Sequence, residues 1–175
     1  MNFKKSSLFA IALVAVSAVP SFAAQGMYGL GYFRPEAPVG VRAWFSEKTA
    51  LDLGVGFNLN SPDGGDSQSA FVLDAGLPLV AAESGNAKFF VRPGVTFASS
   101  PSPTEDDADN KTTQFWLSGT FGVEYFFTDR FSVQAAHGVL FKSVDPDKAG
   151  TKYTELTSED FGVSNIGFHF YFGGK

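Results

Sequence analysis

Apolar and polar side chains alternate with a period of two along almost the whole chain after residue 25. In the segment 51–57 (Leu-Asp-Leu-Gly-Val-Gly-Phe), every odd-numbered position is apolar. Successive side chains of a β-strand point to opposite faces, so this pattern predicts strands with one apolar face. The pattern recurs in eight segments: 27–34, 39–45, 51–57, 71–79, 89–97, 115–125, 131–141 and 161–172. The sequence therefore predicts an all-β protein with eight strands of roughly 9–11 residues, the length that crosses a bilayer at a tilt.

The connections between these segments are of two kinds. Segments 46–49, 81–87 and 128–130 are short, whereas 58–69, 99–112 and 143–160 are longer and rich in Asp, Ser, Pro, Gly and Lys. Short turns at one end and longer loops at the other are typical of antiparallel, up-and-down transmembrane β-barrels. Only the first connection, 35–38, is short where a long one is expected.

Composition excludes several classes of protein. Cys is absent from the 175 residues, which excludes disulfides, thiolate catalysis and Cys-ligated metals. The formal net charge of −5 and a pI near 4.9 argue against a nucleic-acid partner, because binding phosphates requires a basic face. No run of 18 apolar residues follows the first segment, so a helical membrane protein is excluded.

Residues 1–23 have the organisation of a secretory signal peptide. Lys4 and Lys5 precede an apolar run at 8–19, and small residues stand at Ser21 and Ala23. Twelve helical residues span about 18 Å, which is too short for the ~30 Å hydrocarbon core. We expect cleavage before Ala24, which leaves residues 24–175 as one outer-membrane barrel domain.

Five charged residues stand on the polar face of neighbouring predicted strands: Arg42, Asp52, Asp74, Arg92 and Glu124. Residues directly opposite in a hairpin are equidistant from its turn, and the four adjacent pairs centre on residues 47, 63, 83 and 108, each within a connection. The five residues are therefore predicted to form a belt of directly opposed charges. An eight-stranded barrel has room inside only for side chains, and buried ions must be paired. We expect the belt to lie in a polar, largely plugged lumen that leaves at most a narrow pore.

Two alternatives to this arrangement follow from the same pattern. The charges could form a salt-bridge ladder on a solvated outer face. The chain would then be a soluble ligand-binding barrel whose odd-numbered apolar positions point inward. Pro78 and Pro93 also interrupt the alternating segments, and each predicts a bulge or a local irregularity.

The end of the chain resembles the C-terminal sorting signal of bacterial outer-membrane barrels. Asn165, Gly167, Phe170 and Phe172 occupy its fixed positions, although the tail Gly173-Gly174-Lys175 continues past the usual final aromatic residue. Segments 40–45 and 51–57 are similar to the second and third strands of the small outer-membrane barrel superfamily, the OmpA- and OmpX-like proteins. The resemblance implies a monomer in the cell outer membrane that contacts lipid and lipopolysaccharide and is inserted by the barrel-insertion machinery. Its members range from structural proteins to adhesins, narrow channels and lipid-modifying enzymes.

Few residues suggest catalysis. The chain has two histidines, His137 and His169, and the serine and acid that follow His137 are Ser143 and Asp145. Nucleophilic catalysis requires a base within hydrogen-bond reach of the hydroxyl, and this spacing does not supply one. We therefore expect no enzyme activity.

The connection 99–112 contains a weak candidate metal site. Its acidic residues are Glu105, Asp106, Asp107 and Asp109. This loop lacks the glycine and the closing glutamate of an EF-hand, so a solvated acidic loop is the favoured interpretation and no cofactor is expected.

The sequence supports four hypotheses of function. The favoured one is a non-enzymatic outer-membrane barrel with a structural or surface-interaction role through its longer loops. The alternatives are a narrow porin-like passive channel, a lipid-A-modifying enzyme that uses His137, and the soluble ligand-binding barrel.

Overall fold

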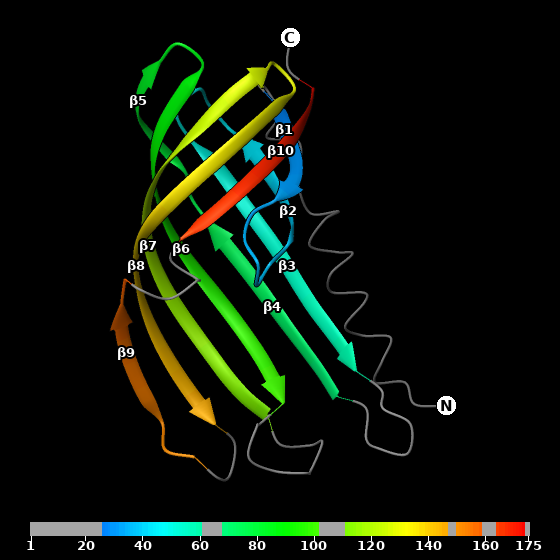
Figure 1. The fold of residues 1–175 in the computed structure, drawn as a ribbon, viewed down its shortest axis with the longest axis vertical. Coiled ribbons are helices and arrows are strands. Elements are labelled where there is room, and N and C mark those ends of the chain that lie inside the picture. Colours follow the sequence, from blue (N-terminus) through cyan, green and yellow to red (C-terminus); the bar gives the residue numbers. More distant parts are fainter. Residues whose placement is uncertain (1–25, 61–67, 102–110, 147–149, 159–163, 174–175) are drawn as a thin grey trace.

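The computed structural model describes residues 26–60, 68–101, 111–146, 150–158 and 164–173. These residues form the predicted all-β fold, a closed eight-stranded antiparallel barrel (Figure 1). The strands are β1 (Met27–Tyr32), β2 (Val39–Trp44), β3 (Ala50–Asn60), β4 (Gln68–Gly76), β5 (Leu79–Ser84), β6 (Ala87–Pro101), β7 (Lys111–Thr128), β8 (Phe131–Pro146), β9 (Tyr153–Thr157) and β10 (Asn165–Gly173). The ten labelled strands make eight wall strands, because two wall strands each consist of two segments. One consists of β4 and β5, which both pair with β6, and the other consists of β9 and β10, which both pair with β8. Pairing of β10 with β1 closes the barrel.

The strands of the wall differ greatly in length, which the prediction of 9–11 residues throughout missed. Strands β1 and β2 have 6 residues each, whereas β6, β7 and β8 have 15, 18 and 16. The barrel is consequently tall along β6–β8 and short along β1 and β2 (Figure 1).

The segment before the last strand also departs from the prediction. Strand β8 continues to Pro146, and β9 lies within the segment 143–160 that was predicted to be a loop. The final strand begins at Asn165 in the described residues, and the predicted start at 161 lies outside them. The sequence of β9, Tyr-Thr-Glu-Leu-Thr, has strong β-propensity but is too short to show a clear period.

Pro78 and Pro93 share one irregularity. The wall strand formed by β4 and β5 is interrupted at Leu77 and Pro78, which confirms the prediction for Pro78. Strand β6 runs through Pro93 without a register shift against β7, so no bulge occurs on that side. The Pro93 carbonyl accepts a hydrogen bond from the Leu77 amide at 2.9 Å, which places the missing amide of the proline opposite the interruption. The irregularity therefore affects the pairing of β4 and β5 with β6 and leaves the pairing of β6 with β7 regular.

The short turns lie at one end of the barrel, together with the start of β1 and the end of β10 (Figure 1). They join β2 to β3, β5 to β6, and β7 to β8. The ends of β3, β6 and β8 and the starts of β4, β7 and β9 lie at the opposite end (Figure 1), and residues 61–67, 102–110 and 147–149, which follow β3, β6 and β8, lie outside the description. The two ends are called below the short-turn end and the long-loop end.

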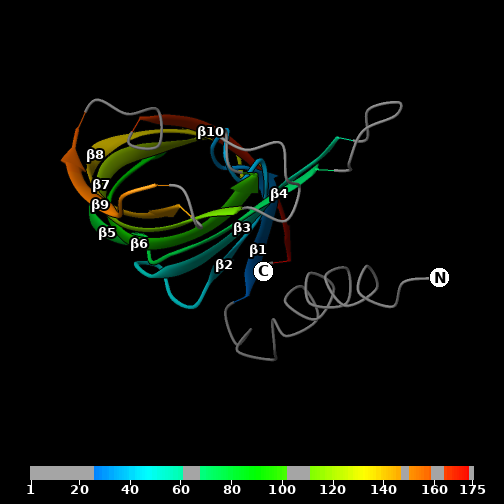
Figure 2. The same cartoon turned by 90° about the horizontal axis from the view of Figure 1, so that it is seen from below.

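The two faces of the wall have opposite polarity. In β3, the even-numbered residues Ala50 to Gly56 are buried and the odd-numbered Leu51, Leu53 and Val55 are half-buried on the outer face. Figure 2, a view along the barrel, shows the strands arranged around a common axis. The buried set inside is rich in charged and polar side chains, whereas large apolar side chains point outward. The soluble barrel with an apolar lumen is therefore wrong, since it requires the odd-numbered positions of these strands to face inward.

Candidate functional site: an ion network in the barrel lumen

All five residues of the predicted belt lie inside the barrel, and each side chain is at least nine-tenths buried. Ion pairs join them into one connected set with two further residues of the first connection. This set is called the lumen network and consists of Arg34, Glu36, Arg42, Asp52, Asp74, Arg92 and Glu124. It links β2, β3, β4, β6, β7 and the connection between β1 and β2.

Arg42 is the centre of the part of this network nearest the short-turn end. Its Nε and Nη2 atoms donate to the two carboxylate oxygens of Asp52 at 2.7 and 2.8 Å, and its Nη1 donates to Glu124 Oε2 at 2.7 Å. The guanidinium also lies 5.7 Å from the ring centres of Phe33 and Phe90. A bidentate pair with aromatic neighbours suits the planar guanidinium and would not be reproduced by lysine.

Arg92 continues the network toward the long-loop end. Its Nε donates to Asp52 Oδ2 at 2.8 Å, and its Nη2 donates to Asp74 Oδ2 at 2.5 Å. The hydroxyl of Thr96 donates to the other oxygen of Asp74 at 2.6 Å. Each carboxylate therefore has donors on both oxygens, as burial of a charge requires.

The register corrects three of the four predicted pairings. Arg42 is directly opposite Asp52, as predicted. Asp52 is opposite Gly76 instead of Asp74, since the register is displaced by two residues.

The next two pairings are displaced by four residues each. Asp74 is opposite Thr96, and Arg92 is opposite Thr120. A midpoint within a long connection leaves several registers open, and even the short turn between β5 and β6 centres between Gly85 and Asn86 instead of on residue 83. An arginine side chain can also reach a carboxylate that is not directly opposite. The charges meet across the lumen without forming a flat belt.

Glu124 anchors the network at the short-turn end. Its Oε1 accepts hydrogen bonds from Ser132 Oγ and from Tyr171 Oη at 2.7 Å, and it lies 3.2 Å from His169 Nδ1. Sequence reasoning did not find these partners, although Ser132, His169 and Tyr171 all occupy inward positions of an alternating strand. The inward position was the signal that could have identified them.

The connection between β1 and β2 folds into the lumen, and sequence reasoning missed its role. Ala37 N donates to Arg34 O at 3.2 Å, which closes a tight turn with Pro35 at its second position. Arg34 is 3% exposed; its Nη1 donates to Asp74 Oδ1 at 3.0 Å and its Nε to Glu36 at 3.2 Å. This turn, residues 33–38, is called the inward loop. Its inward course explains why the first connection is short.

Glycines on the inward faces of β2 and β3 provide the space for the inward loop. A Cβ atom at Gly40 would lie 1.5 Å from the Phe33 ring, and one at Gly56 would lie 2.0 Å from the Glu36 carbonyl oxygen. A Cβ atom at Gly76 would similarly lie 2.1 Å from the Arg92 guanidinium. These glycines permit close approach of the loop and of a large side chain to the wall.

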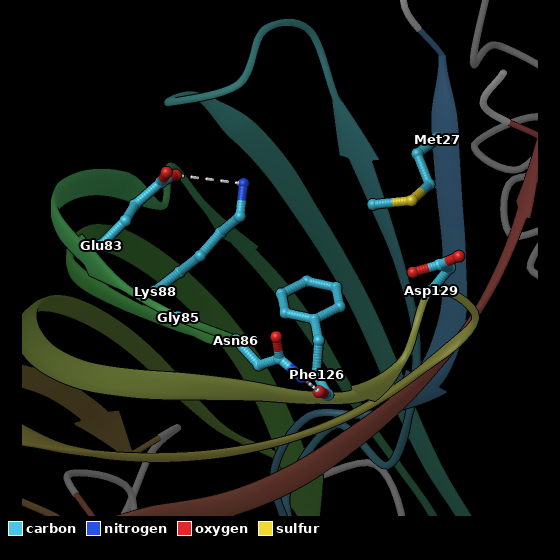
Figure 3. Close-up of a pocket in the computed structure, with 7 residues that line it drawn as sticks. All are labelled: Met27, Glu83, Gly85, Asn86, Lys88, Phe126 and Asp129. Carbon is cyan, nitrogen blue, oxygen red and sulfur yellow. Dashed lines mark hydrogen bonds and ion pairs between the residues drawn. The ribbon is translucent and has the colours of Figure 1, made fainter.

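A mainly aromatic layer lies in the lumen on the short-turn side of Glu124. Trp44, Val80 and Tyr171 form a buried cluster with Met27 and Phe126 packed against it. The short-turn side of this layer carries a shallow pocket of about 290 Å³ (Figure 3). In the close-up, Phe126 lies in the middle of the pocket, between the Glu83–Lys88 ion pair and the side chains of Met27 and Asp129.

The residues of the enzyme hypothesis are not brought together. His137 and Ser143 lie on one strand, six residues apart, which corresponds to roughly 20 Å of chain. Asp145 forms an exposed ion pair with Lys152. His137 Nδ1 lies 2.7 Å from Ser164 Oγ on the outer surface, and His169 belongs to the lumen.

The residues that resemble the sorting signal belong to β10. Phe170 and Phe172 are exposed on the outer face at 50% and 61%, whereas Gly167 faces the lumen beside Gln134. Asn165 is opposite Ala136 at the start of the strand. Gly173 has a positive φ of 79° and ends the strand, and residues 174 and 175 lie outside the description.

Several predictions fall outside the described residues. They are the signal peptide at 1–23 and the acidic side chains Glu105, Asp106, Asp107 and Asp109. Within the described part of the chain, no group of three or more His, Asp or Glu side chains is placed to hold a metal ion. The same part contains no helix that is long and apolar enough to cross a membrane.

The chain matches no protein-family model and no curated protein sequence. It is similar to the crystal structure of a major outer membrane protein from Thermus thermophilus, with 14% sequence identity and a TM-score of 0.34. The match covers 84% of this chain and 97% of that one. Identity and TM-score at this level assign neither a family nor a function.

Proposed function

We propose that this protein is a bacterial outer-membrane β-barrel with a sealed lumen and a non-enzymatic structural or surface-interaction role. The observation that carries the proposal is the inverted polarity of the wall. Charged side chains are buried inside, while Phe, Leu, Val and Ile side chains are exposed on every side of a closed sheet. In water such an exterior would favour aggregation, whereas in a bilayer it is the required surface.

The outward residues of β7 illustrate the apolar surface. Phe115, Leu117, Phe121, Tyr125 and Phe127 are between 45% and 62% exposed along a single strand. A closed barrel also satisfies its backbone hydrogen bonds between strands, which a lipid environment demands. Residues 115 to 127 span roughly 40 Å along the strand, and at a strand tilt of about 45° this corresponds to a height of roughly 28 Å, close to the ~25 Å apolar band of known transmembrane barrels.

The sealed lumen favours a structural or surface role over a channel. Trp44, Tyr171 and Phe126 occupy the short-turn end, the lumen network fills the middle, and the inward loop lies beyond it toward the long-loop end. The loops at the long-loop end are then the parts available for contact with other molecules outside the cell. We infer that the chain belongs with the OmpA- and OmpX-like barrels on the basis of the C-terminal signature and this architecture.

Membrane fractionation combined with gel mobility tests the proposal. We expect the protein in the outer-membrane fraction, and an unboiled sample that migrates differently from a boiled one because the folded barrel resists detergent. A protein that is recovered in the soluble fraction and needs no detergent would contradict the proposal.

Conductance in planar bilayers separates the sealed barrel from the narrow channel. We expect no steady conductance from the wild-type protein, and an increase for Arg34→Ala, which releases the inward loop from Asp74. Lys152→Ala, which removes an exposed ion pair at the long-loop end, is the matched control and should show no steady conductance. A wild-type protein that conducts steadily would establish the channel.

A further inference from the structure

The ion pairs of the lumen network form a single alternating chain with a carboxylate at each end. In the order of the pairs, its members are Glu36, Arg34, Asp74, Arg92, Asp52, Arg42 and Glu124. Four carboxylates therefore face three guanidinium groups, and the network carries one excess negative charge. The two ends differ in their environment, because the Glu36 side chain is 22% exposed whereas that of Glu124 is 1% exposed. The buried end at Glu124 is the one that water does not solvate.

Three buried acceptor atoms near Glu124 have no hydrogen-bond partner among the described residues. They are Gln134 Oε1, Asn165 Oδ1 and His169 Nε2. We assign the ring proton of His169 to Nδ1, since this atom lies 3.2 Å from Glu124 Oε1, and the assignment leaves Nε2 as an acceptor. Gln134 and His169 are 3% and 0% exposed. Buried polar atoms are normally paired, so these acceptors indicate a bound group that supplies positive charge or donors.

The strand register makes these three acceptors neighbours. Gln134 of β8 is directly opposite Glu124 on one side and Gly167 on the other. Asn165 and His169 are the inward residues on either side of Gly167 in β10. Gly167 has no side chain, and the Gln134 side chain lies over it, with Nε2 3.1 Å from the place where a Cβ atom would stand. The acceptors therefore lie together beside the carboxylate that ends the charge chain.

We propose that Gln134, Asn165 and His169 bind one monovalent cation, Na⁺ or K⁺, beside Glu124. Two of the acceptors are amide oxygens, which are suitable ligands for hard cations. One positive charge neutralises the lumen network, whereas a divalent cation would exceed the excess charge. Water alone would satisfy the acceptors without supplying charge, and it is the alternative that the experiment must exclude. The site goes beyond the proposed role of the protein and depends only on the folded barrel.

A cation in this site would stabilise the seam where the barrel closes. Gln134 belongs to β8, whereas Asn165 and His169 belong to β10. Strand β10 pairs with β8 over residues 165–170 and with β1 on its other side. The cation would thus link the last strand to its neighbour from inside the lumen. Its removal should make the barrel easier to unfold.

Urea unfolding in vesicles of neutral lipid measures this dependence. Na⁺ or K⁺ is compared with choline at the same ionic strength, because choline is too large for a buried site. With a dissociation constant of about 10 mM, replacing choline by about 100 mM Na⁺ or K⁺ lowers the unfolding equilibrium constant about tenfold. Gln134→Met removes one acceptor, keeps the side-chain length and should abolish the difference. Ser118→Ala, which removes another buried hydroxyl without a partner, on β7 away from Glu124, is the matched control and should retain it.

A ¹⁵N NMR spectrum of the His169 ring provides a second test that does not depend on the stability of Gln134→Met. His137→Asn leaves His169 as the only histidine of the chain. At neutral pH we expect a neutral ring with its proton on Nδ1 and an Nε2 resonance that shifts when Na⁺ or K⁺ replaces choline. A protonated imidazolium ring, or an Nε2 resonance that is the same with all three cations, would overturn the proposal.

The unfolding data contain two further contradictory outcomes. Equal stability of the wild type in choline, Na⁺ and K⁺ would leave water as the only occupant of the site. A cation dependence that persists unchanged in Gln134→Met would place the bound ion elsewhere in the barrel. Either result would refute the site beside Glu124 and leave the outer-membrane role untouched.

Discussion

The inward and outward faces of the same strands differ in how strongly they depend on the identity of each residue. On β3, Asp52 is held by three hydrogen bonds from two arginines, and Gly54 faces the inward loop. The alternate residues Leu53 and Val55 lie on the outer face, where no charged group is near in the register. One face depends on the identity of each residue and its partner, whereas the other depends only on its apolar character.

This difference predicts how tolerant each face is to substitution. A buried ion that loses its partner retains its desolvation cost, so changes inside should be expensive and specific. An outward apolar residue can be exchanged for another at little cost, but a charge there must enter the bilayer.

Arg42→Met should have the largest effect. It leaves Asp52 and Glu124 inside the barrel without their shared guanidinium, which should lower the free energy of unfolding by about 3–5 kcal/mol. Urea unfolding in lipid vesicles measures this change. Lys152→Met breaks the exposed pair with Asp145 and should cost less than about 1 kcal/mol. Equal effects of the two variants would contradict a buried network.

Phe121→Arg tests the outer face. The Phe121 side chain is 62% exposed near the middle of β7, so the arginine would lie at the bilayer midplane and destabilise the barrel by about 2–4 kcal/mol in vesicles. Phe121→Leu should have little effect, because it retains an apolar surface. If the arginine variant were as stable as wild type in the same vesicles, the outer face would not contact lipid.

Gly40→Ala and Gly119→Ala compare the two faces with the same chemical change. A methyl group at Gly40 meets the Phe33 ring and must displace the inward loop, which should cost about 1–3 kcal/mol. A methyl group at Gly119 points outward and meets only Val139 at 3.9 Å, so its effect should lie within about 0.5 kcal/mol. Unfolding midpoints in urea report both. Similar losses at the two glycines would show that the loop does not fill the lumen.

Thr96→Val should have the smallest effect of the inward changes. It removes the hydroxyl that donates to Asp74 but keeps the shape of the side chain, and the expected cost is about 0.5–1.5 kcal/mol, because the two arginines remain. Thr113→Val, on the outward face of β7, should leave the unfolding free energy unchanged. A neutral result at Thr96 would mean that the arginines alone satisfy Asp74.

The sequence predicted the closed barrel and the polarity of its faces because both depend on the period of two. The segment 39–45 corresponds closely to β2, and the five charged residues Arg42 to Glu124 all lie inside. The contacts between them were not predictable from midpoints, since the flexible arginines pair across displaced registers.

The inward loop was beyond sequence reasoning for a different reason. Its position is determined by tertiary contacts of Arg34 and by the absence of side chains at Gly40 and Gly56, and no local pattern records either. Strand β9 was missed because five residues are too few for a period. The short length of the first connection, where a long one was expected, was the one local sign that this loop follows an unusual course.

Quenching of tryptophan fluorescence by brominated acyl chains tests the central claim most directly. The chain has two tryptophans, Trp44 and Trp116, and both are buried inside the barrel. In vesicles that contain brominated lipid we predict weak quenching of the wild-type emission and strong quenching of the added emission in Phe121→Trp. Strong quenching of the native tryptophans, with none at position 121, would contradict a polar lumen enclosed by a lipid-facing wall.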